Sequence, residues 1–237
     1  MKAREFITEA TWQDQVKPAM KADKQIESPE KVAQFFEYVK QNCGPFLKSI
    51  GGIKNLNSYI LYHGTFTKLN PAVILKVRKD REPVDTPLET QELIDDWFER
   101  ASGIRFRESS IFAVGKHGSA IAYGNVAALM PIGNFNYAWS PIYDDLTGKL
   151  EAFLERKMTK RQVDYDDDDT IISGGAGMFF VRSDVTNPEY INEFMNRGDF
   201  RINHGMIDAI QSHKEIMLDC DRVIVVSDNW LDRISEQ

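Results

Sequence analysis

A histidine followed by a glycine lies at the end of an apolar run in the first third of the chain. The segment Tyr62-His63-Gly64-Thr65 closes the run Ser58–His63. A histidine at a strand end can donate a hydrogen bond to a sugar hydroxyl. The glycine beside it lets the backbone N–H and C=O approach a planar amide closely. On its own, the segment is more typical of a strand-end turn that contains a structural histidine.

An aromatic residue lies on a second candidate strand, and a run of small residues follows it. Phe112 belongs to Ser109-Ser110-Ile111-Phe112-Ala113, and Ser119 belongs to the segment from Gly118 to Tyr123. The ring of Phe112 could be a stacking platform for a flat ligand ring. Buried aromatic rings belong to hydrophobic cores far more often, so this segment alone favours an ordinary core strand.

A carboxylate opens a third candidate strand. Glu215 follows Ser212-His213-Lys214 and precedes the apolar run Ile216-Met217-Leu218. We expect the acid to lie at the border between the core and the solvent, where it could stabilise a cationic transition state. Many edge strands begin in the same way, so the segment is informative only together with the other two.

Together, the three segments resemble the ADP-ribosyltransferase fold. In the poly-ADP-ribose polymerase branch the order is His-Gly-Thr or His-Gly-Ser, then Gly-Ile-Tyr-Phe with Lys-Ser-Ala-x-Tyr, then a glutamate on a strand. The resemblance places His63 on the family histidine, Gly64 on the glycine that holds the nicotinamide amide, and Glu215 on the glutamate. The other positions of the pattern fall on Thr65, Phe112 and Ser119.

Two positions depart from the family pattern. Phe112 keeps an aromatic ring but lacks the tyrosine hydroxyl. His213 stands two residues before Glu215, where many toxin-like members carry the Glu or Gln that helps to present the acceptor. In the toxin-like branch the middle motif is Ser-Thr-Ser, and that branch would give weight to Ser109 and Ser110. The type of acceptor is therefore left open.

The resemblance implies an enzyme, a mono-ADP-ribosyltransferase that consumes NAD as its substrate, with no metal site. Glu215 would bind the 2′-hydroxyl of the nicotinamide ribose and stabilise the oxocarbenium-like cation that forms there. His63 would hold the adenosine-side ribose, and Phe112 would stack on the nicotinamide. The implied catalytic residues are Glu215 and His63, and the implied NAD-binding residues are His63, Gly64, Thr65, Ser110, Phe112 and Ser119.

Three further segments resemble a family of proteins from large tailed bacteriophages. They are Met1–Ile7, Arg78–Pro83 and Pro131–Pro141. This resemblance implies a phage-encoded protein that acts in the host cytoplasm or is associated with the virion. Its acceptor would be a host protein or a host nucleic acid. The alternative is a non-catalytic phage protein on the same fold, either a virion component or a binding protein for host takeover.

The charge balance limits the classes of partner. The chain has 237 residues, with 29 Lys and Arg against 36 Asp and Glu, a net charge of −7. This balance argues against sequence-independent binding to duplex nucleic acid, which needs a basic surface. A nucleic-acid-modifying transferase is a third alternative, and it would need a local basic groove. The candidates for such a groove are Arg78, Lys79, Arg81, Arg105 and Arg107.

Helix and strand signals alternate along the chain and predict an α+β fold, with a split β-sheet core and flanking helices as the resemblance implies. Residues 1–27 are expected to be a leader or a loosely docked segment, and residues 28–237 a single domain. Helices are predicted after the caps at Ser28, Thr86 and Asn187, the second with a capping box. Strands are predicted at 58–63, 73–77, 110–114, 125–130 and 178–181, with a terminal hairpin of 215–218 and 222–226 around 219–221.

Other patterns in the sequence do not predict a function. The segment His117–Tyr143 contains no Asp, Glu, Lys or Arg, but its glycines and prolines argue against a membrane-spanning helix. No membrane partner is therefore expected. The acidic run Asp164–Asp169 begins like a calcium loop but lacks the glycine at position six and the glutamate at position twelve, and its role is not predicted. Cys43 and Cys220 are too few for a disulfide scaffold. The pattern does not predict the oligomeric state.

Overall fold

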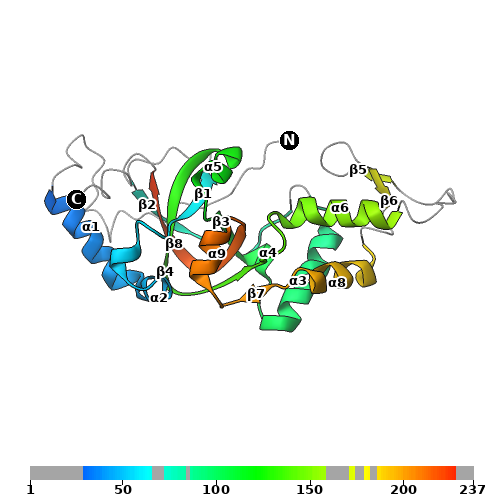
Figure 1. Ribbon diagram of the computed structural model, residues 1–237, viewed down its shortest axis with the longest axis horizontal. Helices are drawn as coiled ribbons and strands as arrows, with labels where there is room; N and C mark the ends of the chain where they lie inside the picture. The colour runs from blue at the N-terminus through cyan, green and yellow to red at the C-terminus, as the bar shows by residue number, and fades with distance from the viewer. Residues whose placement is uncertain are drawn as a thin grey trace.

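The structure of the protein is a computed structural model that describes residues 29–65, 72–83, 86–158, 171–173, 179–181 and 186–227. The predicted leader, 1–27, and the acidic run lie outside the described residues. The chain has an α+β fold (Figure 1). The helices are α1 Pro29–Asn42, α2 Gly44–Ser49, η2 Ile53–Asn55, α3 Leu88–Ser102, α4 Phe106–Ser109, α5 His117–Ala120, η3 Ile121–Tyr123, α6 Leu146–Met158, α8 Pro188–Arg197 and α9 Met206–Ser212. The strands are β1 Leu61–Thr65, β2 Ala72–Lys76, β3 Ile111–Val114, β4 Asn125–Trp139, β5 Ile171–Ser173, β6 Phe179–Val181, β7 Arg201–Ile202 and β8 Glu215–Ser227.

Six strands form one antiparallel sheet in the order β2-β8-β3-β1-β4-β7. Strand β4 also pairs with β8, so β8, β3, β1 and β4 form a closed circuit of hydrogen-bonded neighbours. Strands β5 and β6 form a separate antiparallel pair. The circuit makes β8, β3 and β1 successive neighbours, although they lie far apart in the sequence.

The two longest strands, β4 and β8, pair from Ala127 opposite Ser227 to Trp139 opposite Ile216. The predicted hairpin around 219–221 is therefore wrong, because β8 runs straight through these residues. The segment has no glycine, and all the positive-φ residues of the described chain lie elsewhere, so nothing there favours a tight turn. Cys220 instead lies opposite Phe135 on β4.

Two hydrophobic clusters lie in different parts of the molecule. The first joins α1, α2 and α9 to the inner residues of the sheet, and it includes Cys43 and Cys220 as buried free thiols. The second joins α3, α4, α6 and α8 to Phe112 and Met217. Figure 1 shows α1 and α2 at one end of the molecule and α3, α6 and α8 at the other. Strands β1, β3 and β8 lie between these two groups of helices.

The helix caps agree with the sequence in one case and differ in another. Asn187 accepts hydrogen bonds from the backbone N–H groups of Glu189 and Tyr190 and caps α8, as predicted. Helix α3 has Pro87 rather than Thr86 at its N-cap position, and the hydroxyl of Thr86 lies 3.4 Å from that of Thr147. Among the described residues, none of the helices has the length and apolar character that a membrane span requires.

Candidate functional site

Three of the sequence-predicted residues lie on three neighbouring strands. His63 is on β1, Phe112 is on β3, and Glu215 is the first residue of β8. Val114 is paired with Glu215, and Phe112 is paired with Met217. Residues two apart on a strand share a face, and directly paired residues share it too. Phe112 and Glu215 therefore lie on the same face of the sheet.

His63 connects β1 to the backbone of β3. Its side chain is 4 % exposed, and its Nδ1 lies 2.7 Å from the carbonyl oxygen of Phe112. A carbonyl oxygen only accepts, so Nδ1 carries the proton in this contact. Thr65, two residues further along β1, is also buried. This hydrogen bond of His63 holds β1 close to β3. The contact of His63 with the adenosine-side ribose remains a prediction.

Gly64 lies against the segment that carries Ser119. A side chain added at Gly64 would place its Cβ 2.4 Å from Cβ of Tyr123 and 2.6 Å from the carbonyl oxygen of Ala120. No side chain fits at this distance, so glycine is required for η3 and the end of α5 to pack on β1. Ser119 is half-buried on α5 and is thereby held next to the His-Gly-Thr strand.

Glu215 is partly shielded from solvent. Its side chain is 20 % exposed, and its carboxylate Oε1 lies 3.5 Å from Nη1 of Arg107. Its backbone N–H donates to the carbonyl oxygen of Asp144, at 3.2 Å. Burial raises the pKa of the Glu215 carboxyl above its ordinary value; Arg107 and Arg81 oppose this rise, and Asp145 adds to it.

Two guanidinium groups lie over the ring of Phe112. The Cζ atom of Arg81 is 4.2 Å from the ring centroid, and that of Arg107 is 4.9 Å from it. Both distances are within the range of a cation–π contact. Arg107 thus contacts both the predicted stacking ring and the predicted catalytic carboxylate, and it joins the two into one cluster.

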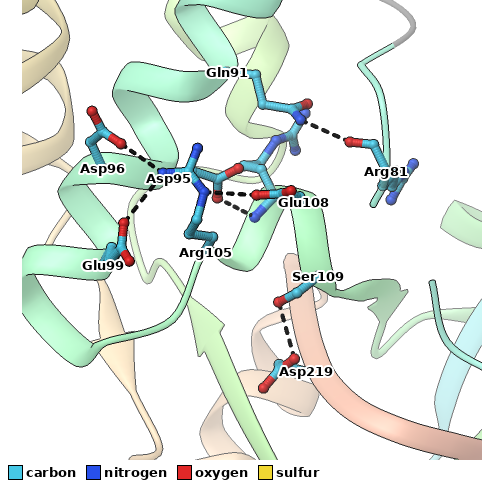
Figure 2. Close-up of polar contacts among 10 residues, drawn as sticks. Arg81, Gln91, Asp95, Asp96, Glu99, Arg105, Glu108, Ser109 and Asp219 are labelled. Atoms are coloured by element: carbon cyan, nitrogen blue, oxygen red, sulfur yellow. Dashed lines mark hydrogen bonds and ion pairs between the residues drawn. The ribbon is translucent and has the colours of Figure 1, made fainter. Parts of the chain in front are cut away.

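Helices α3 and α4 fix the backbones of these two arginines, and Figure 2 shows Gln91 of α3 beside Arg81. Arg81 donates its N–H to the carbonyl oxygen of Glu108, and its own carbonyl oxygen accepts from Nε2 of Gln91, both at 3.0 Å. The N–H of Arg107 donates to Oδ1 of Asp95, at 2.7 Å. The arginine side chains therefore start from fixed positions next to β3.

The two serines before Phe112 have different surroundings. The hydroxyl of Ser109 donates to Oδ1 of Asp219, at 3.0 Å. Ser110 is 3 % exposed, and its hydroxyl has no hydrogen-bond partner among the described residues. A buried hydroxyl without a partner costs free energy. Ser110 is close in sequence to the cluster, and its binding role remains a prediction.

The basic residues of the nucleic-acid alternative do not form an uncompensated groove. Arg78 makes an ion pair with Asp80, and Lys79 makes one with Asp219. Arg105 contacts three carboxylates, as Figure 2 shows. These three are Asp96, Glu99 and Glu108. Since Arg107 is also paired, with Glu215, most of the positive charge of this region is neutralised locally.

Sequence reasoning did not assign Arg107, Asp95 or Thr147 to the site. The sequence suggests Arg107 only as part of a basic groove, because arginines near one another in sequence are most often solvated. Asp95 is on α3 and Thr147 on α6, and only the tertiary fold brings them to α4. The one available signal was the position of Arg107 shortly before the strand that carries Phe112.

The comparisons with known proteins found nothing similar. No family model matches the chain, and neither the curated proteins nor the solved structures include a match. The function of this chain must therefore be inferred from the geometry of its own site.

Proposed function

We propose that the protein is an NAD-dependent ADP-ribosyltransferase in which Glu215 is the catalytic carboxylate. The observation that supports this most is that the strands carrying His63, Phe112 and Glu215, which are β1, β3 and β8, are successive neighbours in the sheet. Glu215 lies far from His63 and Phe112 in the sequence, yet Arg107 joins Glu215 to Phe112, and His63 contacts the backbone of Phe112. The proposed acceptor is a macromolecule of a bacterial host, in line with the phage resemblance.

The chemistry follows from the charge that develops on the ribose of NAD. The bond between the nicotinamide nitrogen and C1′ breaks, and the bonding electrons leave with the neutral nicotinamide. The ribose becomes oxocarbenium-like, and the acceptor nucleophile then bonds to C1′ and loses a proton. The carboxylate of Glu215 would accept a hydrogen bond from the 2′-hydroxyl and stabilise the cation in a partly shielded position.

The other residues of the cluster have matching roles. The half-buried ring of Phe112 offers a face for the nicotinamide, and Cζ of Arg81 lies 4.2 Å from the centroid of this ring. We expect NAD to displace the guanidinium of Arg81 from the ring. Because the diphosphate of NAD is anionic, the displaced guanidinium would find a bidentate partner close by.

The test is the substitution Glu215→Gln, which keeps the shape of the side chain and removes its charge. We expect the release of nicotinamide to fall by about 10²- to 10³-fold, because a charge that acts on the transition state is lost. The affinity for NAD, measured by calorimetry, should change little. The assay follows labelled NAD in the presence of bacterial lysate and records both free nicotinamide and label transfer.

A matched control is Glu189→Gln, at an exposed position in the first turn of α8. This variant should release nicotinamide at the wild-type rate. If Glu215→Gln also turned over NAD at the wild-type rate, Glu215 would not be the catalytic carboxylate.

One observation favours the non-catalytic alternative. Arg107 contacts both Glu215 and Phe112, and Arg81 contacts Phe112. The same contacts would be found in a cluster that only stabilises the fold. The two proposals differ in NAD affinity. An enzyme must bind NAD and release nicotinamide, whereas a binding protein on the same scaffold need not bind NAD at all.

A further inference from the structure

Arg107 is held at its backbone and at both ends of its guanidinium. Its N–H donates to Asp95, and its Nη2 donates to the hydroxyl of Thr147, at 3.2 Å. Its Nη1 lies 3.5 Å from Oε1 of Glu215, and its Cζ lies 4.9 Å from the Phe112 centroid. The side chain is 12 % exposed, so it is not a mobile surface arginine. The backbone of Arg107 is fixed by α3, and its guanidinium contacts α6 through Thr147 and β3 through Phe112, so the group that it can orient is the carboxylate of Glu215.

We propose that Arg107 is a positioning residue for Glu215, which holds Oε1 of the carboxylate beside the ring of Phe112. The catalytic role of this positioning rests on the proposed function, whereas the contact between Arg107 and Glu215 does not depend on it. The rigid fork of the guanidinium suits this role, because it binds Thr147 through one nitrogen and Glu215 through another at the same time. Lysine could not make both contacts in a fixed geometry.

The charges around Glu215 give the contact a measurable consequence. Arg107 faces the carboxylate from α4, Arg81 faces it from the segment after β2, and Asp145 lies before α6. The residue paired with Glu215 on β3 is the apolar Val114. The neighbouring Lys214 directs its Nζ to the carbonyl oxygen of Pro141. Without Arg107, burial and Asp145 would favour the protonated acid, and the smaller effect of Arg81 would oppose them.

The experiment is a carbon-13 NMR titration of the glutamate carboxyl groups in the full chain, wild type against Arg107→Gln. The Glu215 resonance is assigned by its loss in Glu215→Gln. We expect the titration midpoint of Glu215 to rise by about one pH unit or more in Arg107→Gln, because an opposite charge within about 4–6 Å of a carboxyl group lowers its pKa by about that much. Arg100→Gln is the control, since Arg100 is exposed on α3 and donates to Asn192.

A midpoint that does not change in folded Arg107→Gln would overturn the proposal. If that variant fails to fold, Thr147→Val takes its place, because it removes the second contact of the guanidinium and keeps the shape of the side chain. A smaller rise of the Glu215 midpoint is then expected, and no rise would contradict the positioning role.

The titration is independent of turnover. If the wild type does not release nicotinamide, the proposed function fails, while the NMR result still decides whether Arg107 governs the ionisation of Glu215. If the wild type is active, the acidic limb of its pH–kcat profile should move upward in Arg107→Gln by the same interval as the NMR midpoint. A rate loss without such movement would indicate a structural defect and would contradict the proposal.

Discussion

Asp95 is a buried acid next to the site. Its side chain is fully buried on α3; its Oδ1 accepts from the N–H of Arg107, and its Oδ2 has no hydrogen-bond partner among the described residues. A bare carboxylate oxygen in this position is costly, because nothing replaces the water that it loses. Burial accordingly raises the pKa of Asp95 from 3.8 to about 6, against the opposing effects of the Arg107 N–H, Arg105 and Arg107.

This pKa predicts how stability depends on pH. Between pH 4 and pH 6 the folded protein holds a proton on Asp95 that the unfolded chain has released, so stability falls as the pH rises through this interval. Above about pH 6 the loss is complete, and it corresponds to about 3 kcal/mol. Asp95→Asn keeps an acceptor for Arg107 and removes the charge. We therefore expect the free energy of unfolding of the variant, relative to that of wild type, to increase by about this amount from pH 4 to pH 7, as measured by urea unfolding.

The adjacent Asp96 supplies the control. Its side chain is 48 % exposed and pairs with Arg105, so Asp96→Asn should change stability by less than about 1 kcal/mol. A stability difference between Asp95→Asn and wild type that stays constant from pH 4 to pH 7 would show that Asp95 does not titrate in this range.

Sequence patterns located some site residues and missed others for a physical reason. His63 and Glu215 stand at the ends of apolar runs, and such boundaries are visible in a one-dimensional pattern. The contact of His63 with Phe112 and that of Arg107 with Glu215 join residues far apart in the chain. No local pattern encodes these contacts, because they depend on which strands become neighbours.

Strand β4 bends at a bulge, and Gly133 makes the bulge possible. The register with β8 shifts between Ile132 and Phe135, and Gly133 has a φ of 72°. A non-glycine residue in this conformation is strained, although no atom lies within 4 Å of a Cβ added there. We expect Gly133→Ala to lower the free energy of unfolding by about 1–2 kcal/mol, measured by chemical denaturation, through backbone strain alone.

Gly118 on α5 is the matched comparison. It has no positive φ, and a Cβ added there would have its nearest neighbour, Cε of Lys116, at 4.0 Å. Gly118→Ala should leave stability unchanged or raise it by up to about 1 kcal/mol, because alanine favours helix. Equal effects of the two substitutions would mean that Gly133 is not held in the left-handed conformation.

The apolar spacing predicts α1 correctly, whereas α6 and α9 were not predicted. Val32, Phe35 and Val39 recur at helical spacing, and α1 buries all three. Strand β1 begins later than expected, at Leu61, because its limits are set by pairing with β4. The hairpin error at 219–221 has the same origin. The polar residues there suggested a turn, but Asp219 accepts from Ser109 and from Lys79 within a continuous strand.

The closed circuit of β8, β3, β1 and β4 is the feature of the whole molecule that creates the site. A single antiparallel contact, Tyr62 opposite Val114, joins β1 to β3, and the hydrogen bond from His63 supports it. Sequence order places β1 and β8 at opposite ends of the described chain. The α+β composition could be predicted from the alternation of patterns, whereas this circuit depends on non-local pairing that no local pattern contains.

The distribution of charge over the whole molecule predicts its behaviour toward nucleic acid. The net charge is −7, and four basic residues between β2 and β3 are paired with carboxylates, namely Arg78, Lys79, Arg105 and Arg107. We expect the fluorescence anisotropy of a labelled duplex DNA to stay unchanged at protein concentrations up to ~10 µM in ~150 mM salt, because phosphate contacts need uncompensated cations. Asp80→Asn combined with Asp96→Asn and Glu99→Gln releases part of this charge and should produce weak binding in ~50 mM salt. Micromolar binding by the wild type that weakens steeply with salt would contradict this prediction and would favour a nucleic-acid acceptor over a protein.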